Sequence, residues 1–471
     1  MRAEVFFGSK ETEKSSYSDR YNPYSTQVVS KVAICSAEDA VHALQIASKA
    51  AVSAKASVLS RRCEWMLDVA QRLRECREDM AQTITDEVAK PISFARIEVD
   101  RCIETIILSA EFMRTMSGET INTDAMHSGR KTTAFYFREP CGVVVAITPF
   151  NFPLNLIAHK LAPALVAGNA VVLKPTPEAP LTAYKLVKLF IDSPYATQDA
   201  LSLVYGDAEV GSALVSSKIP RVISFTGSVV VGEIITRQAG IKKLSLELGG
   251  NAATYIDRSA DITHAASRCA LGAFVNSGQV CISLQRIYVD SKIYEQFATQ
   301  LAKEVQKLKV GSPYDEDTFM SAMIDEESLL RASRWIQSAI DSGARALTPI
   351  KSSNNTLSPV VLADVRDDMD VVCEEVFAPI VSLMRVENFE DAKSQMNSTP
   401  YGIQFSIFTN DLEQTTDAIH SLEVGGVVIN EMPTLRFDIQ PYGGVKLSGI
   451  GKEGPRYAIE EMSEIKSVTI C

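Results

Sequence analysis

Glu247-Leu248-Gly249-Gly250-Asn251 and Asn276-Ser277-Gly278-Gln279-Val280-Cys281 open and close the stretch, Leu246 to Ile282, around which this chain is organised. The first segment offers a carboxylate and the second a thiol. Glycine permits tight turns and close approach of a ligand to the backbone, so both reactive groups are expected beside loops. A thiol that attacks carbonyls and a carboxylate that activates water would form a covalent catalyst working through a thioester. Each residue alone also has a simpler interpretation, as an inert buried cysteine or a capping glutamate.

Composition excludes several classes of function. The chain has 471 residues, of which 46% are hydrophobic and 22% charged, so two or three globular domains are expected. A net charge of −11 without any Lys/Arg run argues against nucleic acid as a partner. The N-terminus lacks the apolar region of a secretory signal, and the most apolar segment, Cys141 to Leu173, is interrupted by prolines and polar residues. We therefore expect a cytoplasmic protein with no membrane partner.

Cysteine usage agrees with a reducing compartment. The nine cysteines are scattered and form no C-x-x-C pair, so neither a disulfide framework nor a metal site is expected.

The order of predicted elements changes along the chain. Residues Ala37 to Glu111 have helical periodicity, with a capped alanine-rich run to Ala54 and a second run from Val58 to Glu87. Thr120 to Arg138 is polar and β-branched, which predicts a hairpin outside the main core that pairs with another subunit.

From Gly142 onward, short apolar strands alternate with amphipathic helices that begin at Pro153 and Pro180. This alternation predicts an α/β fold with a parallel sheet covered by helices on both faces. A second α/β alternation follows Asp261, and a second domain is expected to start near residue 251. The predicted strands are 143–147, 170–173, 201–204, 221–225, 252–256, 286–289, 359–362, 380–383 and 426–429.

Phe225-Thr226-Gly227-Ser228-Val229-Val230-Val231-Gly232 joins a predicted strand to a predicted helix. Backbone N–H groups and the helix dipole could receive a pyrophosphate at such a junction. The spacing G-x-x-x-x-G is neither G-x-G-x-x-G nor a P-loop, so these residues alone favour an ordinary strand–turn–helix glycine.

Taken together, these segments resemble the aldehyde dehydrogenase superfamily from about Arg138 to Ile465. The residues that carry the resemblance are Thr148-Pro149-Phe150-Asn151-Phe152-Pro153, Leu173-Lys174-Pro175, Phe225-Thr226-Gly227-Ser228, Glu247-Leu248-Gly249-Gly250, Gly278-Gln279-Val280-Cys281, Glu374-Glu375-Val376-Phe377-Ala378-Pro379 and Pro441-Tyr442-Gly443-Gly444. The ending Gly449 to Tyr457 is similar to the branch that contains lactaldehyde, phosphonoacetaldehyde and non-phosphorylating glyceraldehyde-3-phosphate dehydrogenases.

The resemblance implies three regions. A Rossmann-like NAD(P)-binding domain would comprise residues 1–118 and 139–250, and an α/β catalytic domain residues 251–430. A small β oligomerisation element would comprise residues 119–138 and 458–471, with 431–457 returning to the cofactor domain. It also implies a homodimer or homotetramer.

By the same resemblance, Cys281 is the nucleophile, Glu247 is the base that activates water, and Asn151 donates its amide to the oxyanion together with the Cys281 backbone N–H. Each oxyanion donor is worth about 3 kcal/mol. From the residues alone, Asn151 would be a turn former.

The resemblance further implies that Lys174 contacts the adenosine ribose and that Glu375 and Phe377 fix the nicotinamide ribose and ring. The other implied cofactor contacts are Thr148, Pro149, Phe150, Pro177, Gly206, Phe225, Gly227, Ser228, Val231, Leu248 and Gly249. NAD-preferring relatives often carry a glutamate where this chain has Pro177, so both NAD and NADP are expected, although Glu178 could partly replace that carboxylate.

Two other catalytic hypotheses stay open at this point. A cofactor-independent cysteine hydrolase would pair Cys281 with His159 or His264, and a coenzyme A-acylating dehydrogenase would release its acyl group to a thiol. The ordered Lys174 and Glu375 motifs argue against the hydrolase, and the presence of Glu247 favours hydrolysis by water. The presence of Cys281, Glu247 and Asn151 together also argues against an inactive structural protein.

Three residues predict a substrate that carries an anionic group beyond its aldehyde. Arg101, His159 and Arg436 fall at positions that line the substrate funnel in the superfamily, and two guanidiniums with an imidazole would bind a carboxylate, sulfonate, phosphonate or phosphate. Each has an ordinary alternative: Arg101 paired with Glu98, Arg436 with Asp438, and a buried core histidine. Val280, where phosphate-using relatives tend to carry arginine, weakens the case for a doubly charged group.

Overall fold

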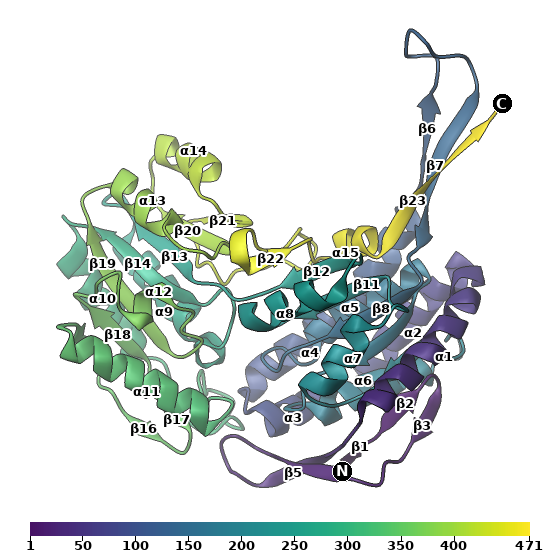
Figure 1. The fold of residues 1–471 in the computed structure, drawn as a ribbon. Helices are drawn as coiled ribbons and strands as arrows, with labels where there is room; N and C mark the ends of the chain where they lie inside the picture. Colours follow the sequence, from purple (N-terminus) through teal and green to yellow (C-terminus); the bar gives the residue numbers. More distant parts are fainter.

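The computed structural model describes residues 1–471, which form two α/β lobes and a projecting arm (Figure 1). The first lobe is built on an eight-stranded sheet of order β22-β12-β11-β8-β9-β10-β2-β3, whose five central strands run parallel. Its strands are β2 (Val5–Phe7), β3 (Lys10–Thr12), β8 (Val143–Ile147), β9 (Ala170–Lys174), β10 (Leu201–Leu203), β11 (Val222–Thr226), β12 (Lys243–Glu247) and β22 (Gly449–Ile450).

Helices cover this sheet, and a smaller sheet flanks it. The helices are α1 (Ala37–Ala56), α2 (Leu59–Glu75), α3 (Arg77–Val88), α4 (Ile92–Thr115), α5 (Asn155–Ala167), α6 (Pro180–Ile191), α7 (Ala208–Ser216), α8 (Val229–Ala239) and α15 (Pro455–Glu461). The flanking sheet has the order β1-β5-β4, with β1 (Arg2–Ala3), β4 (Tyr17–Tyr21) and β5 (Val28–Ala33). The strands β8 and β9 are buried along their whole length, as expected for a parallel sheet covered on both faces.

The second lobe contains a seven-stranded sheet of order β15-β18-β19-β14-β13-β20-β21. Its strands are β13 (Ala252–Ile256), β14 (Leu284–Asp290), β15 (Arg345–Ala346), β18 (Val360–Ala363), β19 (Ile380–Val386), β20 (Gln404–Phe408) and β21 (Gly426–Ile429). A separate hairpin pairs β16 (Ser352–Ser353) with β17 (Thr356–Leu357). The helices are α9 (Ile262–Phe274), α10 (Tyr294–Gln306), α11 (Glu326–Asp341), α12 (Asp370–Cys373), α13 (Phe389–Asn397) and α14 (Leu412–Ser421).

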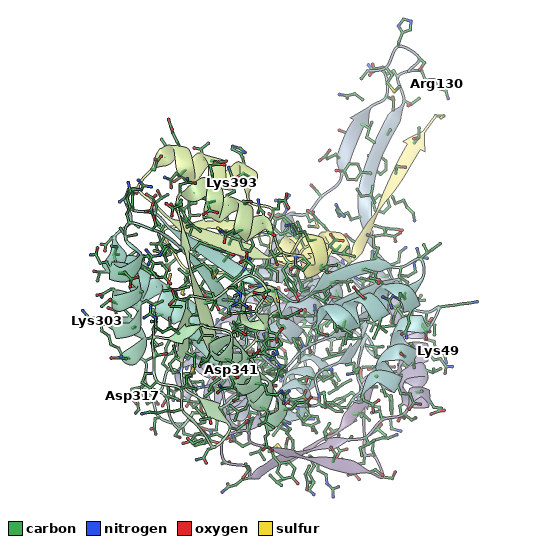
Figure 2. The ribbon with its side chains drawn as sticks, turned by 60° about the vertical axis from the view of Figure 1, so that its left-hand side comes forward. Lys49, Arg130, Lys303, Asp317, Asp341 and Lys393 are labelled. Carbon is green, nitrogen blue, oxygen red and sulfur yellow. The ribbon has the colours of Figure 1, made fainter.

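The arm is a three-stranded antiparallel sheet of β6 (Glu119–Asn122), β7 (Thr133–Pro140) and β23 (Ser463–Ile470). It extends away from both lobes in Figure 1, and Figure 2 shows Arg130 near its far end. The predicted hairpin is therefore confirmed, and the C-terminal residues add the third strand.

Most predicted strands and both helices that follow Pro153 and Pro180 are confirmed, with three differences. The predicted helical run from Val58 to Glu87 is two helices that meet at Cys76, and the strands β12 and β20 were missed. The N-terminal strands β1 to β5 and the two-residue strands β15, β16, β17 and β22 were not predicted either. Residues 252–256 continue the first alternation in sequence but belong to the second sheet, between β14 and β20. None of the helices has the length and apolar character that crossing a membrane requires.

Candidate active site

A cavity of about 580 Å³ lies between the two lobes, and both reactive groups of the sequence line it. It contains Glu247 from the end of β12 and Cys281 from the loop before β14. Parallel strands place their carboxyl ends at one edge of a sheet, and ligands of such folds bind outside that edge. The cavity is therefore positioned for a ligand that contacts both lobes.

The loop that carries Cys281 is held in an unusual backbone conformation. Asn276, Ser277 and Gly278 have φ angles of 53°, 57° and 70°, all in the left-handed region. A Cβ on Gly278 would lie 2.2 Å from the Ala378 carbonyl oxygen, so glycine is required there. The Ser277 hydroxyl donates to the Ser321 carbonyl at 2.9 Å. Backbone strain of this kind collects at functional sites.

The Cys281 thiol lies in largely apolar surroundings. Its Sγ atom is 3.1 Å from the Tyr442 hydroxyl. Val280, Ile282 and Ile403 pack with Tyr442 in the same cluster. Burial raises the pKa of the Cys281 thiol to about 12, although the Tyr442 hydrogen bond acts in the opposite direction.

Glu247 is a buried carboxyl group without a hydrogen-bond partner. Neither of its carboxylate oxygens accepts a hydrogen bond from any protein atom. Burial, with the nearby Glu453 as the second cause, raises the pKa of Glu247 well above its ordinary value. An unpaired buried carboxyl group is costly for stability, and such groups are found where a ligand or water supplies the partner.

Asn151 lines the same cavity from the loop between β8 and α5. Its side-chain amide donates to the Gln279 carbonyl at 3.0 Å, two residues before Cys281. The Lys90 ammonium donates to the Asn151 backbone carbonyl at 2.7 Å and forms an ion pair with Glu98. Glu98 also accepts from the Leu154 backbone N–H at 2.9 Å, at the start of α5. The Asn151 loop is thus anchored to both α4 and the cysteine loop.

Eight of the predicted cofactor residues line the cavity: Pro149, Phe150, Gly227, Ser228, Leu248, Gly249, Glu375 and Phe377. Ser228 caps α8 by accepting from the Val231 N–H at 3.4 Å, so the helix N-terminus opens toward this side. A Cβ on Gly249 would lie 2.5 Å from a Glu375 carboxylate oxygen. Burial raises the pKa of Glu375 to about 7.

The other six predicted cofactor residues do not line this cavity: Thr148, Lys174, Pro177, Gly206, Phe225 and Val231. Lys174 ends β9 and is buried, at the same edge of the sheet. The Phe225 ring packs against the loop that contains Gly227, because a Cβ on Gly227 would lie 2.3 Å from that ring. A helix N-terminus, a glycine cradle and an adjoining apolar wall formed by Phe150 and Phe377 together fit a dinucleotide.

The three predicted anion-binding residues lie together, but Asp438 pairs with all of them. The Arg101 guanidinium makes two hydrogen bonds to Asp438, of 2.9 and 2.8 Å, and does not pair with Glu98. His159 Nε2 lies 3.0 Å from Asp438 and Arg436 Nε lies 3.4 Å from it. Arg436 also lies 3.3 Å from Glu453. Arg101 and Arg436 line the cavity.

The prediction for His159 was wrong in placement. Its side chain is completely buried behind the cavity wall, and burial lowers its pKa. The imidazole serves Asp438 as a hydrogen-bond partner, and burial disfavours its charged form.

The sequence prediction missed several residues of the site. Lys90 carries no local signal of function and was not named, and Glu98 and Asp438 were considered only as partners of Arg101 and Arg436. Glu453 lines the cavity and pairs with Lys160 at 3.0 Å. Tyr442 and Glu453 stand inside motifs that were recognised, so the motifs located them without indicating their roles.

Comparison with known proteins identifies the family. Residues 10–468 match the model of the aldehyde dehydrogenase family. The chain is 39% identical over 455 residues to the 3-sulfolactaldehyde dehydrogenase of Priestia aryabhattai, covering 95% of this chain and 94% of the relative. It is 38% identical over 453 residues to the lactaldehyde dehydrogenase of Methanococcus aeolicus, with coverages of 95% and 96%.

Solved structures agree with this result. Aldehyde dehydrogenase 21 of Physcomitrella patens, in complex with its reaction product succinate, has a TM-score of 0.96 and 34% identity, covering 100% of this chain and 98% of that one. The NADP-dependent glyceraldehyde-3-phosphate dehydrogenase of Bacillus halodurans, complexed with NADP, has a TM-score of 0.98 and 33% identity, with coverages of 100% and 99%. The chain belongs to the aldehyde dehydrogenase family and is an enzyme that oxidises an aldehyde with NAD or NADP.

Proposed function

We propose that this enzyme oxidises a small aldehyde bearing one negative charge to its carboxylic acid, with Cys281 as nucleophile and Glu247 as base. One observation supports the catalytic roles: the Cys281 thiol, in apolar surroundings, and the buried Glu247 carboxyl group, which has no hydrogen-bond partner, line the same cavity. In the first step the Cys281 sulfur attacks the aldehyde carbon, and the carbonyl electrons move to oxygen. The product is a thiohemiacetal.

Asn151 stabilises the oxygen that becomes negative in this step. Its side-chain amide already points at the cysteine loop, where it donates to the Gln279 carbonyl at 3.0 Å. The Cys281 backbone N–H supplies the second donor. Loss of one such donor costs about 3 kcal/mol of transition-state stabilisation. The nicotinamide dinucleotide, when bound, accepts the hydride that the aldehyde carbon loses.

Residues of both lobes would hold that cofactor. Gly227 and Ser228 at the start of α8 would bind the pyrophosphate, and Glu375 and Phe377 the nicotinamide ribose and ring. Lys174, at the end of β9, would contact the adenosine ribose. The remaining cofactor residues named from the sequence stay part of this proposal as supports of these contacts.

Glu247 completes the reaction by removing a proton from water, whose oxygen attacks the thioester carbon. The carbon–sulfur bond then breaks, releasing the acid and restoring the Cys281 thiolate. A base is most effective when its pKa lies near the working pH, and burial shifts the pKa of Glu247 in that direction. An available base favours transfer of the acyl group to water over transfer to coenzyme A.

The charges around the cavity favour a substrate with a single negative charge. Lys90 pairs with Glu98 and Lys160 with Glu453, which leaves Arg101 and Arg436 to share the carboxylate of Asp438. Within this set of four cations and three carboxylates, one positive charge is uncompensated. Arg101 is also the most exposed of these cations, with 26% of its side chain accessible. Guanidinium groups suit carboxylates and sulfonates.

The names of the relatives support this substrate class. Sulfolactaldehyde carries a sulfonate, and the succinate bound to the Physcomitrella enzyme carries a carboxylate beyond the one formed in the reaction. Val280 occupies the position before the nucleophile, so no additional cation is supplied there for a doubly charged phosphate.

The test compares two aldehydes of similar length, succinic semialdehyde and butanal, with each cofactor. The wild-type kcat/KM is expected to favour the anionic aldehyde, and Arg101→Leu should lower only that value, by about 10- to 100-fold for a lost charge-assisted hydrogen bond. Arg77→Leu is the matched control, since Arg77 pairs with Asp100 outside the cavity. Equal losses on both aldehydes, or a wild-type preference for butanal, would contradict the proposal.

We further propose that the arm joins two subunits, as a homodimer or within a homotetramer. Its strands expose Ile121, Phe137, Ile465 and Ile470, which is unfavourable for an isolated sheet in water. Light scattering on the intact chain and on a chain ending at residue 462 tests this assembly, with loss of the oligomer expected on truncation.

All nine cysteines are free, which supports the cytoplasm as the location of the enzyme.

A further inference from the structure

Tyr442 is the one residue whose side chain hydrogen-bonds the Cys281 thiol. The Tyr442 hydroxyl lies 3.1 Å from the cysteine Sγ and has no other hydrogen-bond partner. Tyr442 lies between β21 and β22, 161 residues after Cys281 in the sequence. The contact between the two residues is therefore created by the fold. Only 6% of Tyr442 is exposed, and solvent does not compete for its hydroxyl.

The surroundings of Tyr442 favour its hydroxyl as the donor of this bond. The Arg436 guanidinium lies 3.7 Å from the centre of the Tyr442 ring. A cation on the ring face attracts the π electrons and makes the phenol a better hydrogen-bond donor. Glu247, the nearby carboxyl group, has no hydrogen bond to the thiol. The apolar side chains of Val280 and Ile282 oppose ionisation of the thiol, so its charge needs a donor.

We propose that Tyr442 is a further catalytic residue, whose hydroxyl donates a hydrogen bond to the Cys281 thiolate and increases the fraction of nucleophile that is ionised at neutral pH. This inference rests on the proposed role of Cys281 as the nucleophile. The proton lost by the thiol passes to solvent, and Tyr442 keeps its own proton throughout. When the sulfur lone pair forms the bond to the aldehyde carbon, negative charge moves from sulfur to the carbonyl oxygen and the bond from Tyr442 weakens.

Two opposing effects decide whether this bond accelerates the reaction. A hydrogen bond to a charged group should lower the pH of half-ionisation by about one to two units, which gives about 10- to 100-fold more thiolate. A stabilised thiolate attacks more slowly, with a Brønsted coefficient of about 0.4–0.5, so each thiolate loses about 3- to 10-fold in rate. The gain in thiolate exceeds the loss, and the net acceleration is about 3- to 10-fold.

The experiment measures alkylation of the cofactor-free enzyme by iodoacetamide between about pH 6 and pH 10, where the thiolate is the reacting form. Mass spectrometry follows the peptides of Cys281 and of the exposed Cys373, which serves as the reference within each sample. In Tyr442→Phe the Cys281 rate is expected to fall about 3- to 10-fold at every pH on the rising part of the profile, while the Cys373 rate is unchanged.

Tyr255→Phe is the matched control, because its buried hydroxyl bonds Asp257 at 3.2 Å elsewhere in the second lobe. Unchanged thermal unfolding and NADP affinity in Tyr442→Phe would exclude a general loss of structure. A Cys281 rate that is unchanged or higher in Tyr442→Phe overturns the inference, and so does an equal loss in Tyr255→Phe. The dehydrogenase activity of Cys281→Ser separates the two proposals. If either overturning result is found and Cys281→Ser is inactive, only the role of Tyr442 fails and the proposed function stands. If Cys281→Ser stays active, the proposed function itself fails.

Discussion

Glu247 and Glu453 are two buried carboxyl groups that line one cavity, and their surroundings differ. Glu453 accepts a hydrogen bond from Lys160 at 3.0 Å and lies 3.3 Å from Arg436, and these cations lower its pKa to about 2. Glu247 has no partner, and burial raises its pKa well above the ordinary value. Environments that separate the pKa values of two carboxyl groups assign them different roles. Glu453 is suited to stay ionised and to fix the positions of Lys160 and Arg436, and Glu247 is suited to take up and release a proton.

The largest expected effect concerns the nucleophile that both carboxyl groups surround. Cys281→Ser should reduce aldehyde-dependent reduction of NAD or NADP to the level of a blank, because a serine hydroxyl ionises far less readily than a thiol. Absorbance at the wavelength of reduced nicotinamide measures this. Cys63→Ser and Cys471→Ser are controls, since one residue is buried in the first lobe and the other lies exposed at the C-terminus. Substantial turnover in Cys281→Ser would indicate another nucleophile.

The second effect separates the two carboxyl groups by catalysis. Glu247→Gln should retain a burst of reduced cofactor and lose about 100-fold or more in the steady state, because only thioester hydrolysis needs the base. Stopped-flow absorbance resolves the two phases. A variant without a burst would assign Glu247 an earlier step.

The third effect separates them by stability. Glu453→Gln should destabilise the fold by about 3 to 5 kcal/mol, because it leaves the buried Lys160 without a carboxylate partner and Arg436 with only the shared carboxylate of Asp438. Glu247→Gln should leave the thermal midpoint unchanged or raise it, since no partner is lost and a costly charge is removed. Thermal unfolding at neutral pH compares the two variants. A lower midpoint for Glu247→Gln than for Glu453→Gln would contradict the assignment.

The dependence of stability on pH follows from the same pKa values. The folded pKa of Glu453 lies below its ordinary value of 4.5, so its contribution is present above that pH and is lost as the pH falls toward about 2. The folded pKa of Glu247 is raised, so its contribution is present below 4.5 and is lost as the pH rises through the folded value. Each Gln variant should remove the corresponding part of the pH profile.

The smallest effect concerns the cofactor. NADP should be accepted within a thousandfold of NAD, because Pro177 supplies no carboxylate and Lys174 remains near the adenosine end. Glu178, whose carboxylate bonds the Thr176 hydroxyl, is one of the negative groups near Lys174. Glu178→Gln should raise the NADP/NAD ratio of kcat/KM by roughly fivefold, as expected for about 1 kcal/mol of repulsion removed. An unchanged ratio would show that Glu178 does not oppose the 2′-phosphate.

The sequence predicted local features more completely than tertiary ones. Uniform apolar strands such as β8 and β9 are determined by their own residues, and so were found. The roles of Cys281, Glu247 and Asn151 were predicted from the family motifs in which they stand, and the fold brings the three residues to one cavity. The pairing of Arg101 with Asp438 joins residues 337 positions apart, and no local pattern encodes it.

The same reason explains the wrong placement of His159. Its place in the substrate funnel was inferred from its spacing after Asn151 in the family pattern, but its burial against Asp438 depends on a segment 279 residues away. Tyr442 illustrates the intermediate case, since its motif was recognised and its contact with Cys281 was not. Residues that act through contacts between distant segments require the folded structure to reveal them.

The central claim is that the acyl group passes through a thioester on Cys281 and that Glu247 releases it. The most direct measurement is mass spectrometry of Glu247→Gln, quenched in acid after mixing with NADP and succinic semialdehyde. The account predicts that the Cys281 peptide gains the mass of the acyl group, with one acyl group per subunit and none in Cys281→Ser. An unmodified Cys281 peptide during the burst, or an acyl group on another residue, would contradict it.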